Sequence, residues 1–190
     1  MSFGSLQFES RDGARGVFFG PSFRYLSERK AADAPELAGI PDIDWALELG
    51  LKAGMEWEHA QVFGAVRKGL NGHGGWTGEI GADAILRLSN DVTVKFGPRV
   101  AFADDTYMDT YFTVPASATV LTPHTARGGM KSAGLALSVR YDISNVWSVE
   151  GSAEYTRLKG DAAASPIVQV GSADQMAIKL LFIRRFTLEF

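Results

Sequence analysis

Several features that define common protein classes are missing from this chain of 190 residues. Cysteine is absent, which excludes a disulfide framework and a cysteine-ligated metal site. No apolar run reaches the roughly 18 residues of a membrane-spanning helix. The formal net charge is only -3 and both signs are scattered, so the charge does not predict a nucleic-acid partner. The first residues, MSFGSLQFESRDG, lack the basic head, apolar run and cleavage site of a signal peptide.

What the chain does contain is glycine, aromatic residues and a strict alternation of apolar and polar positions. There are 21 glycines and 11% aromatic residues, a mixture typical of all-β proteins. Alternation with a period of two indicates strands with two unlike faces. In the last such segment Arg184 breaks the otherwise apolar face. The pattern predicts eight strands: 16–26, 44–57, 60–69 (the least regular), 76–88, 91–103, 131–142, 146–158 and 175–190.

Alternation alone does not say which face of such a sheet is buried. A soluble barrel turns its apolar face inward, whereas a membrane barrel turns it toward lipid and keeps polar groups in the lumen. The predicted strands run about 10 to 14 residues, enough to cross a bilayer at a tilt. Aromatic residues also gather near the strand ends, as in the girdles of membrane barrels. We therefore expect an all-β, antiparallel up-and-down transmembrane β-barrel that forms a single domain over residues 1–190.

The connections between the predicted strands differ greatly in length. Membrane barrels have short periplasmic turns and longer outer loops. The same alternation holds here, so we place the long connections outside and the short ones in the periplasm. The short turns are 58–60, 89–91 and 142–145, and the long outer loops are 27–43, 104–130 and 159–174.

The two ends of the chain carry separate expectations. With the loops placed in this way, the last strand returns to the periplasm and closes the barrel. Its terminal Phe190 resembles the aromatic signal read by the barrel assembly machinery. A ninth candidate strand at 3–10 would run inward and would need an outward strand before it. Residues 1–13 are therefore expected to be an N-terminal stub or a partial strand of a parent with ten to twelve strands.

Four stretches carry a resemblance to a known family. They are FFGPSFRY (18–25), KFGPRVAF (95–102), DDTYMDTYF (104–112) and WSVEGSAEYTRLKGDAAASPIV (147–168). Together they resemble the MltA-interacting protein family, also called MipA/OmpV, of Gram-negative outer-membrane proteins. The signature positions within them are Asp104, Asp105, Tyr107, Met108, Asp109, Tyr111, Phe112, Gly160, Asp161, Ser165 and Pro166.

The resemblance implies a location and a role. Family members carry a signal peptide and further N-terminal strands, so this chain is expected to be truncated at its start. The resemblance also implies a scaffold in the bacterial outer membrane that links a lytic transglycosylase to a penicillin-binding protein. The membrane-barrel pattern itself, with its outer rim and terminal aromatic residue, adds outer-membrane lipid, lipopolysaccharide and the barrel assembly machinery as expected partners. No catalytic residue and no cofactor comes with the resemblance, so we expect a protein that is not an enzyme.

Two alternative functions remain open on the sequence alone. The first is a small porin-like or osmotically regulated channel. The second is an outer-membrane lipid hydrolase, which would need a serine beside a histidine. The three histidines, His59, His73 and His124, lie in predicted turns and loops on no shared motif. We therefore expect them to be solvated.

Charged residues on the polar faces are expected to fill the lumen with ion pairs, since a barrel of about eight strands is just filled by side chains. Opposite charges that can pair across the lumen include Glu48 with Lys52, and Arg140 near Glu150. The predicted lumen set is Arg24, Glu48, Glu79, Asp83, Arg87, Lys95, Arg99, Arg140, Glu150, Glu154 and Arg185.

Two further local features lead to expectations. Asp104, Asp105 and Asp109 are a weak candidate for a Ca²⁺ or Mg²⁺ site, because hard cations prefer oxygen ligands. The alternative is a solvated acidic strand end with its own aromatic belt. As a family signature, the stretch is also expected to extend a strand and so fold the loop 104–130 onto the barrel. The Gly-Pro pairs at 20–21 and 97–98 lie inside predicted strands. Because proline cannot donate a ladder hydrogen bond, a β-bulge or an altered strand end is expected at each.

Overall fold

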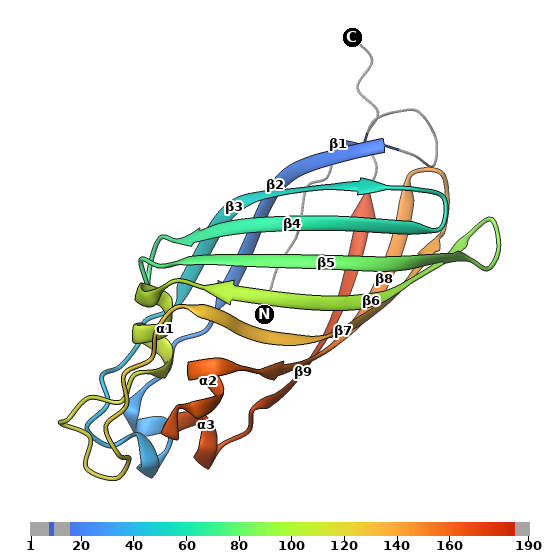
Figure 1. Ribbon diagram of the computed structural model, residues 1–190. Helices are drawn as coiled ribbons and strands as arrows, with labels where there is room; N and C mark the ends of the chain where they lie inside the picture. The colour runs from blue at the N-terminus through green and yellow to red at the C-terminus, as the bar shows by residue number, and fades with distance from the viewer. Residues whose placement is uncertain (1–7, 10–15, 185–190) are drawn as a thin grey trace.

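The computed structural model describes residues 8–9 and 16–184. Within these residues nine strands form one antiparallel sheet, in which every strand pairs with its neighbours in sequence (Figure 1). The eight predicted strands are confirmed, including the irregular segment 60–69. They are β2 (Gly16–Leu26), β3 (Ala46–Glu56), β4 (Ala60–Gly69), β5 (Trp76–Arg87), β6 (Val92–Ala103), β7 (Gly129–Asp142), β8 (Trp147–Leu158) and β9 (Asp174–Arg184), with the short β1 (Phe8–Glu9) beside β2.

The sheet curves into a half-barrel whose outermost strands are β1 and β9 (Figure 1). Phe8 pairs with Phe19 and Glu9 with Phe18, so part of the candidate segment 3–10 is a strand. In the part of the chain that the structure describes, β9 pairs with β8 alone, and the expected closure by the last strand is not reached. The predicted lumen residue Arg185 and the predicted assembly signal Phe190 lie outside the described residues. No helix among the described residues has the length and apolar character that a membrane crossing requires.

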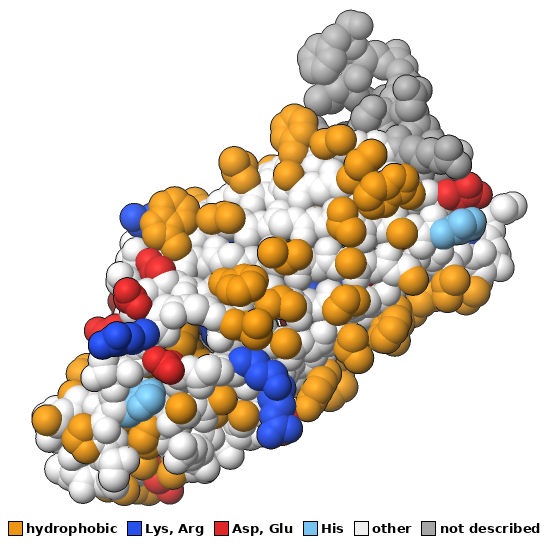
Figure 2. Space-filling model, viewed as in Figure 1, with side chains coloured by type: hydrophobic (Ala, Val, Ile, Leu, Met, Phe, Trp, Pro, Cys, Tyr) orange, Lys and Arg blue, Asp and Glu red, His pale blue; other side chains and the backbone are white. Residues whose placement is uncertain are grey.

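The two faces of the sheet have the polarity of a membrane barrel wall. Leu51 and Ile178 on the convex face are 71% and 77% exposed, and apolar side chains are spread over this face (Figure 2). On the concave face the side chain of Glu48 is fully buried and Asp83 is 4% exposed. Apolar groups outside and charges inside are the inverse of a soluble barrel.

Charged residues on the convex face occur only at strand ends within the described residues. Lys68, Arg157 and Asp174 stand at the end where the long loops lie, and Arg184 stands at the opposite end. The Lys68 ammonium lies 5.1 Å from the centroid of the Trp76 ring, and the Arg184 guanidinium lies 5.3 Å from that of Trp147. Long cationic side chains beside indole rings suit a water–lipid boundary. The irregularity at Arg184 therefore lies at the level of Trp147, where β8 begins.

The long loops fold into an ordered cap at one end of the sheet (Figure 1). We call residues 27–43, 104–128 and 159–173 the cap, its end of the sheet the cap end, and the other the turn end. The cap has two apolar clusters, one around Met108 and one around Val114. Its helices are η1 (Ala31–Asp33), η2 (Pro35–Leu37), α1 (Asp105–Phe112), α2 (Gly160–Ala164) and α3 (Pro166–Val170).

The expectation of a strand extension in 104–130 is wrong, because residues 105–112 form α1. Asp104 is the N-cap of this helix and its carboxylate accepts a hydrogen bond from the Tyr107 N–H at 2.9 Å. Aspartate at this position favours a helix because it satisfies a backbone donor that the first turn leaves unpaired. Met108 and Phe112, four residues apart, share the buried side of the helix.

The bulges expected at the two Gly-Pro pairs are also absent, since the register of β2 with β3 and of β6 with β7 is continuous there. On the β5 side the pairing is interrupted between Gly81↔Arg99 and Ala84↔Phe96, where Pro98 has no N–H to donate. Instead, the Arg99 guanidinium donates to the Ala82 carbonyl at 3.3 Å. A Cβ on Gly97 would lie 1.8 Å from the same carbonyl, so only glycine fits this close approach.

Candidate functional site

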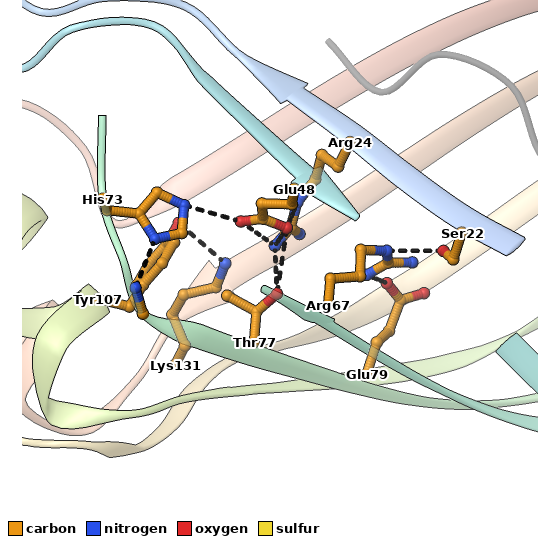
Figure 3. A network of polar contacts seen from close by, with 10 residues as sticks. Ser22, Arg24, Glu48, Arg67, His73, Thr77, Glu79, Tyr107 and Lys131 are labelled. Carbon is orange, nitrogen blue, oxygen red and sulfur yellow. Dashed lines mark hydrogen bonds and ion pairs between the residues drawn. The ribbon is translucent and has the colours of Figure 1, made fainter. Parts of the chain in front are cut away.

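The most buried charge on the concave face is Glu48 of β3, at the cap end. Arg24, directly opposite on β2, donates to both carboxylate oxygens at 2.8 and 3.0 Å (Figure 3). The hydroxyl of Thr77 on β5 donates to Oε2 at 3.1 Å. His73 Nε2 lies 3.3 Å from Oε1. A two-pronged arginine contact is the strong form of such a pair. Hydrogen bonds from Arg24 and Thr77 therefore hold this carboxylate, and His73 lies at ion-pair distance from it.

His73, predicted to be solvated, is buried, and its side chain is 0% exposed. Its Nδ1 accepts a hydrogen bond from the Gly75 N–H at 3.3 Å, which assigns the ring proton to Nε2, facing Glu48. Its ring lies edge-on to Tyr107 and Tyr111 of α1, at centroid distances of 4.8 and 5.4 Å. The prediction failed because the loop at 70–75 folds inward under the cap.

The other two histidines lie elsewhere. The side chain of His59 is 80% exposed in the turn between β3 and β4, as expected. His124 is partly buried in the cap, with Nε2 3.3 Å from the Asp161 carbonyl. Among the described residues none of the three histidines has a serine hydroxyl as a hydrogen-bond partner.

A β-bulge brings Lys131 to the same place. Phe102 pairs with Met130 and Ala101 with Ser132, which leaves Lys131 as the extra residue of β7. Such an extra residue re-aims its side chain. The Lys131 ammonium donates to the Tyr107 hydroxyl at 3.4 Å and lies 4.8 Å from the centroid of that ring. We call Arg24, Glu48, His73, Thr77, Tyr107 and Lys131 the cap-end network.

Tyrosines of α1 cover this network as uncharged groups. Burial raises the pKa of Tyr107, and burial together with the nearby Glu48 charge raises the pKa of Tyr111 to about 12. Both phenols therefore remain protonated at physiological pH. A Cβ on Gly75 would lie 2.5 Å from the Tyr107 backbone nitrogen, so glycine is required where α1 approaches the sheet. The cap is thus fitted closely onto the buried charges.

Further polar contacts follow the concave face of β2–β6 toward the turn end. Arg67 donates to the Ser22 hydroxyl at 2.7 Å and lies 3.3 Å from the Glu79 carboxylate. These contacts adjoin the cap-end network (Figure 3). The deeper contacts are Arg99 with Asp83 at 2.8 Å, Gln61 with Asp83 at 2.6 Å, Lys95 with Gln61 at 2.8 Å and Lys95 with Glu56 at 2.9 Å.

The inferred pairing of Glu48 with Lys52 is wrong, and Arg140, although near Glu150 as expected, forms its ion pair with another carboxylate. Glu48 pairs with Arg24, and the Lys52 ammonium lies 4.1 Å from the centroid of the Phe63 ring instead. Arg140 is opposite Glu150 in the register, yet it contacts the Asp142 carboxylate at 2.9 Å. Glu48 therefore has its partner on a neighbouring strand, whereas Arg140 has its partner on its own strand.

The other predicted lumen charges are less enclosed. Arg87 is exposed at the turn end, with its guanidinium 3.7 Å from Glu56. Glu150 and Glu154 on β8 are partly buried, and no described residue forms an ion pair with either. Sequence reasoning missed Arg67, His73, Thr77 and Lys131. Arg67 and Thr77 lie in strands, where the alternation of polar and apolar residues could have identified them. His73 and Lys131 could not be found in this way, because neither the inward fold of a loop nor a β-bulge has a sequence pattern of its own.

The signature residues hold the cap together. Asp105 accepts a hydrogen bond from the Gly128 N–H at 2.6 Å, and Asp161 accepts one from the Arg127 N–H at 2.9 Å. Ser165 is fully buried and donates to the Phe112 carbonyl at 2.6 Å, which ties α3 to α1. Pro166 starts α3, and Gly160 has a φ of 54°, in the left-handed region. Within residues 8–9 and 16–184 no group of three His, Cys, Asp or Glu could hold a metal ion.

Asp104→Ala is expected to destabilise the cap by about 1 kcal/mol, because it removes the N-cap of α1. The measurement is the rate of limited proteolysis within 105–112 of the detergent-solubilised protein. Asp109→Ala is the matched control, since the exposed Asp109 side chain makes no hydrogen bond to a described residue. Equal proteolysis of the two variants would contradict the capping role. A calorimetric Ca²⁺ signal that both variants abolish would support the metal site instead.

One family model matches the chain, and it covers nearly all of it. The model is described as MltA-interacting protein MipA and matches residues 4–186. Neither a curated protein nor a solved structure matches the chain.

Proposed function

The chain belongs to the MltA-interacting protein MipA family, and on that premise we propose that it is an outer-membrane adaptor without catalytic activity of its own. It would bring a lytic transglycosylase of the MltA type together with a penicillin-binding protein that synthesises peptidoglycan. The observation that carries the proposal is the family match over residues 4–186.

The polarity of the sheet supports the membrane part of the proposal. The convex face of β2–β9 is apolar between its charged ends, and the concave face holds buried ion pairs such as Arg24 with Glu48. Such a surface is stable against lipid and would aggregate in water. Strands that pair with one another satisfy their backbone N–H and C=O groups, as a segment inside a bilayer must.

The arrangement of the polar groups supports the adaptor part. Glu48, Arg67 and Asp83 are engaged with neighbouring side chains on the concave face. Side chains that neutralise one another in this way give the wall rigidity. An adaptor needs such a rigid body, with partners binding to surfaces outside it.

We place the partner surface at the turn end, because peptidoglycan and its enzymes lie in the periplasm. Three short connections form this end, between β3 and β4, β5 and β6, and β7 and β8. Apolar side chains are exposed there, including Leu88 at 68% and Ile143 at 58%. Exposed apolar groups ringed by polar turn residues are typical of protein interaction sites.

The test is an affinity purification from outer-membrane extracts with the tagged protein. We expect it to recover a lytic transglycosylase and a penicillin-binding protein, identified by mass spectrometry. Replacing the turn 142–146 by a glycine–serine linker of equal length is expected to lower that recovery by about tenfold, the effect of losing about 1.4 kcal/mol of contact. The same replacement of 116–120 in the cap is the control and should leave recovery unchanged.

Two results would contradict the proposal. The first is recovery of neither class of peptidoglycan enzyme from a preparation in which the protein is folded and in the outer-membrane fraction. The second is fractionation of the protein away from the outer membrane altogether. Equal loss of recovery from the two linker variants would retain the adaptor and contradict only the turn-end surface.

A further inference from the structure

The distribution of charge on the convex face marks the levels at which the protein would meet the two membrane surfaces. Between the strand ends this face carries no charged side chain on β2–β9 in the described residues. At the cap end the uncharged band finishes at aromatic residues such as Tyr25, Trp45, Trp76 and Tyr155. Aromatic side chains at this position occupy the lipid headgroup level. The charged residues just past them therefore meet the headgroups themselves.

Two exposed cations lie just past Tyr155, where β7 and β8 meet the cap. Arg157 is the second-last residue of β8, and Lys159 follows that strand. The Lys159 N–H donates to the Lys131 carbonyl at 2.9 Å, so Lys159 continues the ladder beyond the strand end. Arg127, whose N–H is bonded to Asp161, instead lines a pocket with Asp105 and Asp109 of α1. Lys and Arg side chains gather beside the cap on this side of the molecule (Figure 2). We call Arg157 and Lys159 the cationic patch.

Among the described residues, the acid that contacts the patch is Asp174. Asp174, opposite Arg157 on β9, accepts a hydrogen bond from the Tyr155 hydroxyl at 2.6 Å and lies 3.8 Å from the Arg157 guanidinium. That separation is an ion-pair contact beyond hydrogen-bond length, so the donors of Arg157 stay available. The side chains of the patch therefore keep hydrogen-bond donors for an external anion.

We propose that the cationic patch binds the phosphate groups of a phosphorylated glycolipid in the outer leaflet. The inference rests on the proposed outer-membrane function, because it needs the cap end to face that leaflet. Phosphate is the matching group, since guanidinium and ammonium donors bind it through charge-assisted hydrogen bonds. The acyl chains of the same lipid would lie along the apolar wall below, against Leu135 on β7 and Tyr155 on β8, both of which are exposed. A single lipid of this kind would thus place its phosphate groups at the cations and its acyl chains on the apolar wall.

The probe is fluorescent bisphosphorylated lipid A, titrated with the full-length protein in a neutral detergent and followed by anisotropy. Lys159→Ala is expected to weaken binding by about fivefold, and Arg157→Ala with Lys159→Ala by about 25-fold, since each cation near a lipid surface contributes about 1 kcal/mol. Lys30→Ala is the matched control. It removes the same charge from an exposed lysine of the cap, which is paired with Glu28 at 2.8 Å, and should leave binding unchanged. Raised salt should weaken the wild-type complex.

Three results would overturn the inference. Equal affinity of all variants would remove the patch as the site. Equal affinity for lipid A without phosphates would show that the acyl chains alone are bound. Displacement of lipid A by inorganic phosphate at the same concentration would indicate a site for free anions. Heat-modified migration in gels checks that each variant is folded.

The outcome is separate from that of the proposed function. Loss of lipid A selectivity with peptidoglycan enzymes still recovered from the extracts would reject the patch and retain the adaptor. Selective lipid A binding by a protein that recovers neither class of enzyme would retain the patch and reject the adaptor.

Discussion

Leu51→Arg is expected to destabilise the membrane-inserted protein by about 2–4 kcal/mol, because it places a cation at the bilayer midplane. Leu51 is the central residue of β3, and its side chain is 71% exposed on the convex face. In a soluble protein an exposed leucine tolerates this change with an effect within about 0.5 kcal/mol. The measurement is urea unfolding of the protein reconstituted in lipid vesicles, followed by tryptophan fluorescence.

Val120→Arg is the control for this prediction. Val120 is 59% exposed in the cap, where the side chain would meet water, so the same gain of a cation should leave the urea midpoint almost unchanged. Equal small effects of the two substitutions would contradict the lipid-facing orientation of the convex face, and with it the outer-membrane proposal.

Glu48→Ala is expected to cost about 3–5 kcal/mol of unfolding free energy, the range for removing one partner of a buried ion pair. The substitution leaves the guanidinium of Arg24 without its carboxylate and also removes the partner of His73 and Thr77. Urea unfolding in the same vesicles measures the loss. Because α1 covers this network, limited proteolysis of the cap should accelerate in the variant as well.

Two comparisons isolate the buried pair. Glu154→Ala removes a carboxylate from the same face at a position where no described residue forms an ion pair with it, and should cost less than about 1 kcal/mol. The double variant Arg24→Met with Glu48→Met leaves no unpaired charge, so it should be more stable than Glu48→Ala. If Glu48→Ala and Glu154→Ala unfold at the same urea concentration, the network has no special part in stability.

The adaptor proposal and the cationic patch divide the molecule between its two ends. The turn end offers exposed apolar tips such as Ile143, while the cap end offers Arg157 and Lys159 just past an aromatic belt. An uncharged convex face separates them. One rigid wall can therefore stand in lipid and present a different surface to each side.

The strands and their polarity were readable from the sequence. Eight segments with a period of two became β2 to β9, since alternation is a local property that each strand carries in its own residues. The alternation also indicated which side chains share the exposed apolar face and which share the polar one. The signature stretches indicated the family, because each is a continuous run of residues that can be recognised without knowing the fold.

The partners of the buried charges were decided by the tertiary structure. Glu48 meets Arg24 and Thr77, which are 24 and 29 residues away, because strand register places them together, whereas the sequence suggested Lys52. His73 became buried when its loop folded under α1. The physical reason is that amphipathicity is encoded residue by residue, whereas a pair of charges is chosen by which strands lie side by side and by how closely the cap packs against them.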